Sequence, residues 1–306
     1  MSQSLYSRPT AEITILAAVS VLFWWRPLAD TFGLALTNDA YTHILLILPL
    51  SAALVYSDWK SLRSKQNDLP AVRSNSRSDR NISLALLALA LMLGAYARWG
   101  MSLATDDVRL SVAMISLVTW WIASIVLCFG GRTLKLFLLP IFFLFLIVPI
   151  PNFALNWIVE FLQLQSARAA RIIFQAIRVP VTQDGIMLYV PGLDVEVARE
   201  CSSIRSSLIL IVTTIVLAHL FLTSWWRKLV LVLLAIPLSI AKNGLRIFTI
   251  VELGTRVDPK FLNGKLHHNG GVIFLGIGVI AVIIPLWLLR RTELRTTLRP
   301  SAPLPQ

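Results

Sequence analysis

Charged residues are scarce in this chain of 306 residues, where they make up 14% of the composition. A typical soluble domain carries about 25%. The chain is instead 56% hydrophobic, with a mean hydropathy of +0.72. Its apolar residues are grouped in blocks of roughly 15–22, the length of helix that crosses the hydrocarbon core of a bilayer. The composition therefore excludes an ordinary soluble fold and predicts an all-α polytopic membrane protein.

Two other kinds of signal are missing. No nucleic-acid-binding motif accompanies the net charge of +12, and the basic residues gather in particular loops, which is typical of membrane topology. The two cysteines form no Cys-x-x-Cys motif, and the four histidines form no His-x-x-x-His motif. We therefore expect the lipid bilayer as a partner, but no nucleic acid, no metal and no cofactor.

Eight apolar runs have the length of membrane spans. They cover residues 13–32, 42–56, 82–96, 110–129, 136–150, 207–223, 229–253 and 270–289. The first run also resembles the apolar region of a signal peptide, but no clear small-x-small cleavage site follows it, so we expect a retained span.

The lysines and arginines of the short loops predict the orientation. Segment 58–81, "GGRTLK", "SWWRKL" and "RRTELRTTLRP" are basic, and all four fall on one side of an eight-span model, which is then cytoplasmic. We expect one transmembrane domain over residues 1–306, with a flexible cytoplasmic loop at 58–81 and a basic cytoplasmic tail at 290–306. The protein is then a multi-pass protein of the cell (inner or plasma) membrane.

Segment 151–205 is predicted to lie outside the membrane, at its outer face. In its first half, apolar residues recur near one helical face, which favours an amphipathic helix lying in the interface. They are Ile158, Phe161, Leu162, Ala169, Ile172, Ile173 and Ile177, and largely opposite them are Glu160, Gln163, Arg168, Arg171 and Gln175. The following "VPVTQDGIMLYVPGLDVEVA" has short β-branched runs broken by Asp-Gly and Pro-Gly, which predict a small β-hairpin or two.

Cys201, in "VARECSSIRSS", follows directly. A disulfide with Cys128 is excluded because the predicted topology puts the two on opposite sides of the bilayer. Cys201 falls in the first turn before span 207–223, where free backbone N–H groups and the helix dipole favour the thiolate. Arg205 acts in the same direction and Glu200 opposes it. This setting suits a nucleophile, and an inert buried cysteine is the alternative.

Arg246 lies inside span 229–253, where a guanidinium costs at least about 2.5–3.5 kcal/mol on insertion scales. Lys242 and Asn243 share its helical face. Pairing with a carboxylate is the alternative explanation, but few acidic residues lie within the spans. The predicted orientation puts Arg246 on the same side as Cys201, where it could stabilise a thiolate and a developing oxyanion.

Two adjacent histidines, His267 and His268, lie in "GKLHHNGG" at the outer mouth of the last span. Imidazole is the usual proton shuttle for a thiol nucleophile, although either residue could be an ordinary interfacial histidine. His43 and His219 are weaker candidates. A thiol, a guanidinium and an imidazole at one membrane level together indicate Cys–His nucleophilic catalysis with an arginine electrophile.

Two other classes of function stay open. A transporter or channel would bind an anionic substrate through Lys242 and Arg246. A noncatalytic membrane scaffold would need none of these groups.

Several motifs resemble the exosortase/archaeosortase family. "VARECSSIRSS", "NGLRI" and "LHHNGG" occur in the family's order on the last three spans, and "YTHILLILPLSAALVYSDWKSL", "FFLFLIVPIP" and "LQLQSARAARIIFQAIRVPV" agree with it. The resemblance covers about residues 40–290. Ser203 departs from it, since the family pattern has Gly in a Cys-Ser-Gly run.

The resemblance implies a membrane-embedded cysteine protease or transpeptidase. Such enzymes act on membrane-anchored, exported proteins that carry a C-terminal sorting signal of the PEP-CTERM type. Cys201 would be the nucleophile, Arg246 the electrostatic stabiliser and His267 the acid/base, with His268 as its alternative. From the residues themselves, we expect Arg205 and Asn243 to be supporting residues. The active site would then face the extracytoplasmic side.

Overall fold

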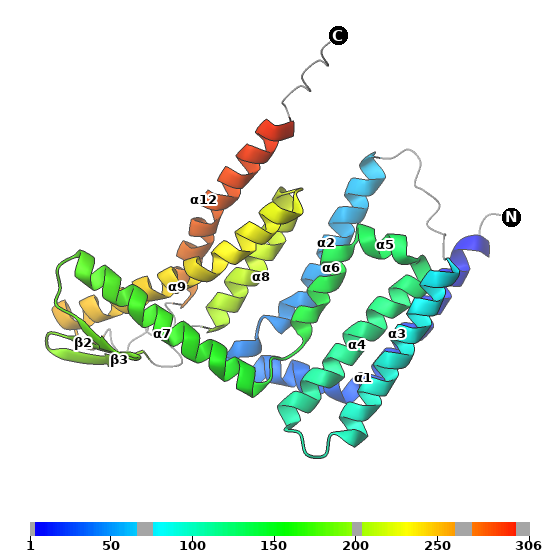
Figure 1. The fold of residues 1–306 in the computed structure, drawn as a ribbon, viewed down its shortest axis with the longest axis horizontal. Coiled ribbons are helices and arrows are strands. Elements are labelled where there is room, and N and C mark those ends of the chain that lie inside the picture. The colour runs from blue at the N-terminus through cyan, green and yellow to red at the C-terminus, as the bar shows by residue number, and fades with distance from the viewer. Residues whose placement is uncertain (1–3, 66–75, 198–203, 261–270, 298–306) are drawn as a thin grey trace, which may run out of the picture. The chain divides into compact units, whose positions relative to one another are not determined.

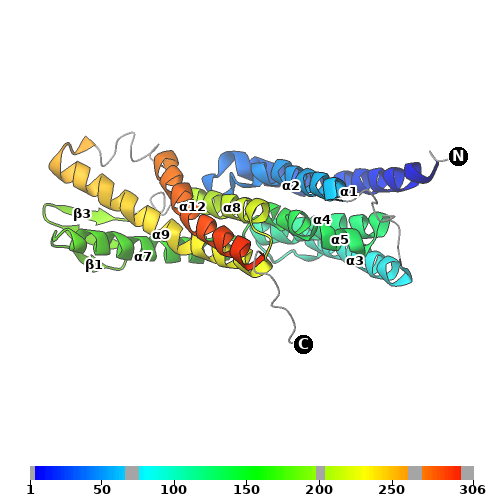
Figure 2. The same cartoon turned by 90° about the horizontal axis from the view of Figure 1, so that it is seen from above.

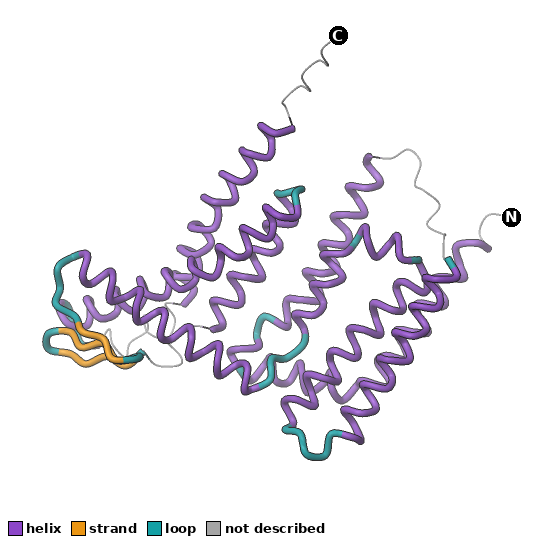
Figure 3. Tube along the Cα trace, viewed as in Figure 1, coloured by secondary structure: helices purple, strands orange, loops and turns teal. Residues whose placement is uncertain are grey.

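The computed structural model describes residues 4–65, 76–197, 204–260 and 271–297. The chain forms two compact units, Met1–Ala154 and Leu155–Gln306. Helices predominate in both, and the described strands form one small sheet (Figure 3). The predicted fold class, an all-α polytopic membrane protein, is confirmed.

Seven helices in the described ranges are long and apolar enough to cross a membrane. Their spans are Ala11–Thr37, Asp39–Ser61, Arg77–Gly100, Asp106–Phe129, Ile204–Phe221, Trp225–Arg256 and Gly271–Arg295. Two further pieces, Leu138–Ile147 and Asn152–Ala176, make an eighth only if they are counted together across the bend between them. Seven of the eight predicted spans thus correspond to single helices.

Unit 1 is built around α4, which packs against α1 and α3 (Figure 1). Its long helices are α1 (Ser4–Thr37), α2 (Ile44–Lys65), α3 (Arg77–Ala95) and α4 (Asp106–Phe129). Its short elements are η1 (Asp39–Tyr41), the π-helical turn η2 (Tyr96–Gly100), α5 (Gly131–Leu136), α6 (Leu138–Phe142) and η3 (Phe143–Ile147). Trp24 anchors the core, since it is 1% exposed and its indole Nε1 donates to Ser116 Oγ over 2.8 Å.

The predicted span 136–150 does not form one regular helix. The helix breaks at Phe137, and the 3-10 turn η3 follows α6 up to Ile147. Pro140 explains the break, because it has no N–H and its ring clashes with the carbonyl of residue 136. Irregular backbone at membrane depth needs other hydrogen-bond partners. Three hydroxyl groups donate hydrogen bonds to backbone carbonyl oxygens of this segment. Ser51 Oγ donates to Pro140 (2.8 Å), Ser111 Oγ to Pro149 (2.7 Å) and Tyr41 Oη to Ile150 (2.7 Å).

Unit 2 holds three helices that contact one another, together with one more helix that carries the sheet (Figure 2). The three are α8 (Ile204–Phe221), α9 (Trp225–Arg256) and α12 (Gly271–Thr297), and the fourth is α7 (Asn152–Ala176), which begins at the end of unit 1. The antiparallel sheet has the order β1 (Thr182–Asp184), β2 (Met187–Val190) and β3 (Leu193–Glu196). This confirms the predicted hairpins.

The sheet is fastened to α7 and α9 by a shared apolar cluster. Its buried members include Phe174 of α7, Leu188 and Val190 of β2, and Ile247 and Val251 of α9. Because the sheet buries side chains against both helices, the chain is held at a fixed place in unit 2 up to Val197, which is 1% exposed. The segment that contains Cys201 begins just after that point.

The faces of α7 differ from the prediction. Gln163, expected opposite the apolar face, is 5% exposed and donates its amide Nε2 to the carbonyl of Val197 over 2.7 Å. Ile172, expected on the apolar face, is 61% exposed, which agrees with a face turned toward lipid. A helical wheel with one apolar and one polar face does not describe this helix. One side packs against other parts of the protein, whereas exposed apolar residues such as Trp157 lie on another side.

Two predicted loop boundaries also need correction. Helix α2 continues to Lys65, so the first part of the predicted loop 58–81 is helical, and α3 begins again at Arg77. Helix α12 continues to Thr297, into the predicted basic tail 290–306. Hydropathy marks where lipid ends, whereas the backbone hydrogen bonds of a helix continue into water when the residues are good helix formers. The prediction of a single domain stays a prediction.

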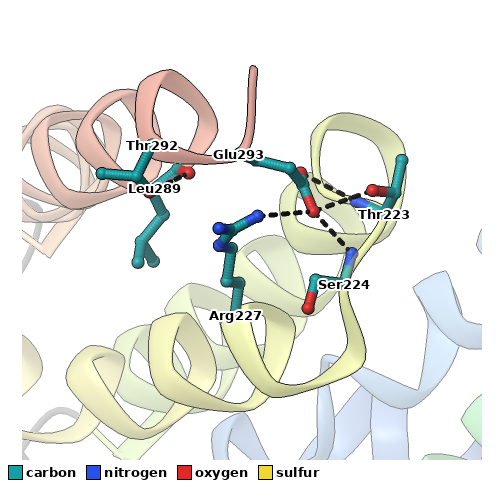
Figure 4. A network of polar contacts seen from close by, with 6 residues as sticks. All are labelled: Thr223, Ser224, Arg227, Leu289, Thr292 and Glu293. Atoms are coloured by element: carbon teal, nitrogen blue, oxygen red, sulfur yellow. Dashed lines mark hydrogen bonds and ion pairs between the residues drawn. The ribbon is translucent and has the colours of Figure 1, made fainter. Parts of the chain in front are cut away.

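A carboxylate ties α12 to the turn between α8 and α9 (Figure 4). Glu293 is 8% exposed and accepts hydrogen bonds from the Oγ1 of Thr223 and the backbone N of Ser224, both at 2.7 Å. It also accepts from the backbone N of Thr223 at 3.1 Å and pairs with the guanidinium of Arg227 at 3.1 Å. The carboxylate thereby satisfies donors at the start of α9 that have no partner within the helix.

Replacing Glu293 tests this contact. Glu293→Gln removes the carboxylate that pairs with the buried Arg227 guanidinium, so we expect a loss of stability of about 3 kcal/mol. The measurement is the apparent unfolding free energy in detergent. Glu252→Gln is the control, because Glu252 pairs with the largely exposed Arg256 one turn away on α9, a contact worth about 0.3–0.5 kcal/mol. Equal losses in the two variants would contradict the buried role of Glu293.

Helices α7 and α9 cross closely at Gly244. A Cβ placed on Gly244 would lie 2.5 Å from the Cβ of Ala169 and 2.9 Å from the backbone N of Ala170. Both distances are shorter than real contacts, and backbone cannot move aside as a flexible side chain can. The crossing therefore requires glycine, a common device where membrane helices approach closely.

Gly244→Ala should force the two helices apart and lower the stability by about 1–3 kcal/mol. Gly276→Ala is the matched control, because nothing lies within 4 Å of the new Cβ on α12. That variant should be neutral or gain up to about 1 kcal/mol from the helix preference for alanine. Thermal unfolding of the detergent-solubilised chain measures both, and an unchanged midpoint for Gly244→Ala would refute the close crossing.

Candidate functional site

The structure describes some of the predicted site residues and not others. Arg246, Asn243 and Arg205 are described, whereas Cys201, His267 and His268 lie outside the described residues. The stretches that flank the undescribed residues belong to unit 2. The candidate site is therefore built from the side chains of α7, α8 and α9.

A stripe of polar residues is buried along α9. Lys242, Asn243 and Arg246 are 4%, 1% and 5% exposed, and Ser239 one turn earlier is 2% exposed. Their spacing of three and four residues puts them on one side of the helix. The face inferred from the sequence is thus a buried one, turned toward the neighbouring helices.

Each of three residues on this stripe hydrogen-bonds a serine of another helix. Lys242 Nζ donates to Ser206 Oγ at 2.5 Å, and Ser239 Oγ donates to Ser207 Oγ at 2.7 Å, so both reach α8. Asn243 Nδ2 donates to Ser166 Oγ of α7 at 2.9 Å. The residues of these three hydrogen bonds, together with the buried Arg246, are called the "polar layer" of unit 2. They are Ser166, Ser206, Ser207, Ser239, Lys242, Asn243 and Arg246.

The polar layer contains two cations one turn apart. Within the described residues, no carboxylate forms an ion pair with Lys242. Its stem packs beside Gly278 of α12, where a Cβ added to the glycine would lie 3.1 Å from Lys242 Cδ. The Ser206 hydroxyl accepts a hydrogen bond from the ammonium without cancelling its charge. Water is largely excluded around both cations, so their fields are screened less than at a surface.

The other predicted residues lie as follows. Arg205 is the second residue of α8 and is exposed. His219 is in the last turn of α8, far along the helix from Arg205. In unit 1, His43 is 5% exposed with its Nδ1 3.2 Å from the carbonyl of Ala40, and Cys128 is a half-buried free thiol. Neither of the last two belongs to the polar layer.

The four serines of the polar layer were not predicted. A serine in an apolar span can bond a carbonyl of its own helix, so its presence alone does not reveal a partner on another helix. Their signal in the sequence is only that they fall in or beside "CSSIRSS", "PLSIAKN" and "LQSARAA", near the charged candidates. Among the described residues, no group of three or more His, Cys, Asp or Glu side chains is placed to hold a metal ion.

Comparison with known proteins supplies the family. A sequence model described as transmembrane exosortase matches residues 12–285 of the 306. The chain belongs to the transmembrane exosortase family. The resemblance read from the motifs is thereby confirmed, and exosortase membership supports a general role as a membrane transpeptidase or protease that acts on protein substrates. No curated protein and no solved structure matches the chain.

The bond between α7 and α9 gives a testable energy in this exosortase. We expect Asn243→Ala and Ser166→Ala to be coupled by about 0.6 kcal/mol, and at most roughly 1.7 kcal/mol, as is usual for hydrogen bonds between membrane helices. A double-mutant cycle on the unfolding free energy measures this coupling. A cycle of Ser166→Ala with Ser239→Ala is the control, since Ser239 bonds Ser207 instead. Equal coupling in both cycles would contradict the specific pair.

Proposed function

We propose that this exosortase is a cysteine transpeptidase that cleaves the C-terminal sorting signal of membrane-anchored, exported proteins. The observation that carries the proposal is Arg246, a guanidinium buried in the polar layer of a chain that belongs to the exosortase family. A guanidinium in a span is costly to keep, and its usual reason is function. Its charge persists at every physiological pH, which suits an electrostatic catalyst.

In the proposed reaction, the Cys201 thiolate attacks the scissile carbonyl carbon, and a C–S bond forms as the carbonyl π bond breaks. Arg246 donates hydrogen bonds to the resulting oxyanion. His267, or His268 in its place, gives a proton to the leaving amine as the C–N bond breaks, and a thioester remains. An amine or a water then attacks the thioester, loses a proton to the same histidine and releases the thiolate. The product is a transferred or a hydrolysed chain.

The described neighbours support this assignment of Cys201. It follows Val197 by four residues and precedes Ile204, the start of α8, by three. Three residues of fully extended chain span at most about 11 Å, so the proposal requires the thiol close to the first turn of α8. Ser206, which receives the Lys242 hydrogen bond, lies in that turn. The two histidines lie on the chain between α9 and α12, whose helices contact each other.

Two features of the polar layer suit oxyanion stabilisation. First, the guanidinium lies where water is scarce, so its field is screened less than at a surface. Second, hydrogen bonds to α7 and α8 fix the helix that carries it, so little reorganisation is needed when charge develops. In the orientation predicted from the loop charges, the site faces the outside of the cell membrane, where exported substrates arrive.

The decisive experiment is co-expression of the full chain with an exported protein that ends in a sorting signal, with processing followed by mass. Cys201→Ala should abolish processing, and wild type should yield a covalent adduct that hydroxylamine removes. Arg246→Gln should slow processing by about 10²–10³-fold, the usual effect of losing an oxyanion donor. Arg256→Gln, at the exposed end of the same helix, should have no effect.

Separate His267→Ala and His268→Ala variants identify the proton donor, whose loss should slow processing by about 10²–10⁴-fold. Wild-type processing by Cys201→Ala would refute the proposal. If no variant altered processing, the chain would be a scaffold. The transporter alternative is based on the buried Lys242 and Arg246. It would be favoured if both the wild type and Cys201→Ser bound an anionic solute and neither of them processed the substrate protein.

A further inference from the structure

The polar layer contains a buried acceptor to which no described residue donates. Asn243 is 1% exposed, and its Nδ2 donates to Ser166 Oγ over 2.9 Å. Its Oδ1 is buried as well, and none of the residues that the structure describes donates a hydrogen bond to it. A carbonyl oxygen that is taken out of water without a partner costs about 1–3 kcal/mol. Buried groups of this kind are few in native proteins, and each requires an explanation.

The neighbours of Asn243 hold its amide in one orientation. Gly244 lets α7 come close enough for the hydrogen bond to Ser166. An amide group is planar, so the bond from Nδ2 to α7 also determines the direction of Oδ1. Arg246 follows three residues later on the same helical face, where side chains have Cβ atoms about 5–6 Å apart. A fixed acceptor therefore lies beside the guanidinium to which the proposed function assigns the oxyanion.

Stability alone does not account for an asparagine at this position. Leucine has a similar shape and a higher helix preference, and it would bury no polar atom. The hydrogen bond to Ser166 is worth about 0.6 kcal/mol, which is less than the cost of an unsatisfied carbonyl oxygen. Asn243 is thus unfavourable for the fold unless Oδ1 receives a donor from elsewhere.

A backbone N–H of an extended polypeptide is the donor that fits this position. In a hydrogen-bonded pair of an antiparallel ladder, each residue presents its N–H and its C=O to the same side. Asn243 offers one acceptor and Arg246 offers several donors, so together they match both groups of one such residue. Because both side chains are buried, a substrate carbonyl that reaches Arg246 brings its own N–H out of water, and that N–H needs an acceptor.

We propose that Asn243 Oδ1 accepts the backbone N–H of the substrate residue whose carbonyl carbon is attacked. This inference rests on the proposed function, in which Arg246 binds the oxygen of that same carbonyl. The two contacts hold the residue by both of its backbone groups and align its carbonyl for attack. Since they involve only backbone atoms of the substrate, they position the residue whatever its side chain is.

The test measures binding and processing of synthetic peptides by the full chain in detergent. The peptides carry the sorting signal of the co-expressed protein, and in a series each backbone N–H is replaced in turn by an ester oxygen, which removes the donor. Replacement at the residue before the cleaved bond should slow wild-type processing at least about tenfold. Asn243→Leu should slow processing of the amide peptide by a similar factor and should no longer distinguish the amide from the ester.

Ser166→Ala is the matched control, because it breaks the same bond between α7 and α9 but keeps Oδ1. This variant should still process the amide peptide faster than the ester. The unfolding free energy provides a second readout: Asn243→Leu should not lose more stability than Ser166→Ala, because it also removes the unsatisfied oxygen. A purely structural role of Asn243 predicts instead that stability and processing fall together and that the amide preference persists.

The failure of this inference differs from the failure of the proposed function. If the peptide is processed but the ester at that residue causes no loss, or if Asn243→Leu keeps the amide preference, the contact is refuted and the reaction stands. If wild type processes no peptide but binds the amide form about tenfold more tightly than one ester form, and Asn243→Leu does not, the contact stands without the reaction. A chain that neither binds nor processes any peptide refutes both. If Asn243→Leu failed to fold, the ester series on wild type would still decide.

Discussion

The close approach of α9 to α7 at Gly244 is the contact on which unit 2 depends. The residues on either side of this glycine along α9 carry the chemistry and the packing: Asn243 bonds Ser166 of α7, and Ile247 joins the apolar cluster that holds the sheet. Arg246 lies only two residues beyond. A larger residue at 244 would therefore disturb the packing of the sheet and the position of the guanidinium at the same time.

Serine hydroxyls are the partners of Ser239, Lys242 and Asn243 in the polar layer, and for Lys242 this choice has an electrostatic consequence. Ser206 stabilises the ammonium of Lys242 by a hydrogen bond but adds no negative charge. A carboxylate at the same place would stabilise the fold more directly and cancel the charge of Lys242. Unit 1 uses hydroxyls differently, since Ser51, Ser111 and Tyr41 satisfy carbonyls of a segment that is not helical. In both units a hydroxyl meets the demand of buried polar groups without introducing charge.

The accuracy of each prediction from the sequence depended on the physical property that the underlying pattern reports. Apolar runs located seven spans, because lipid imposes a length and a composition on any helix that crosses it. At 136–150 they located an apolar run but not the break in its helix, where the conformation of Pro140 outweighed hydropathy. They also misplaced helix ends such as Lys65 of α2, since hydropathy says nothing about backbone hydrogen bonds in water. The helical wheel of α7 placed Gln163 on the polar face, whereas the residue is buried against Val197. The wheel failed because α7 has more than two kinds of surroundings along its faces. The buried face of Lys242, Asn243 and Arg246 was predictable, because helical spacing fixes it, but the serines opposite were not, because their partners come from other helices.

Two like charges one turn apart, both buried, are unfavourable for the fold. Lys242 and Arg246 repel each other in a poorly screened interior, and well-packed apolar residues of similar size would cost less. The fold accommodates them through contacts that are otherwise tight: Gly244 lets α7 approach, and Gly278 leaves room for the stem of Lys242. Local rules of stability are broken in natural proteins mainly where function requires it. In unit 2, Arg246 is a residue that stability alone would not select, and function is most reasonably assigned to it.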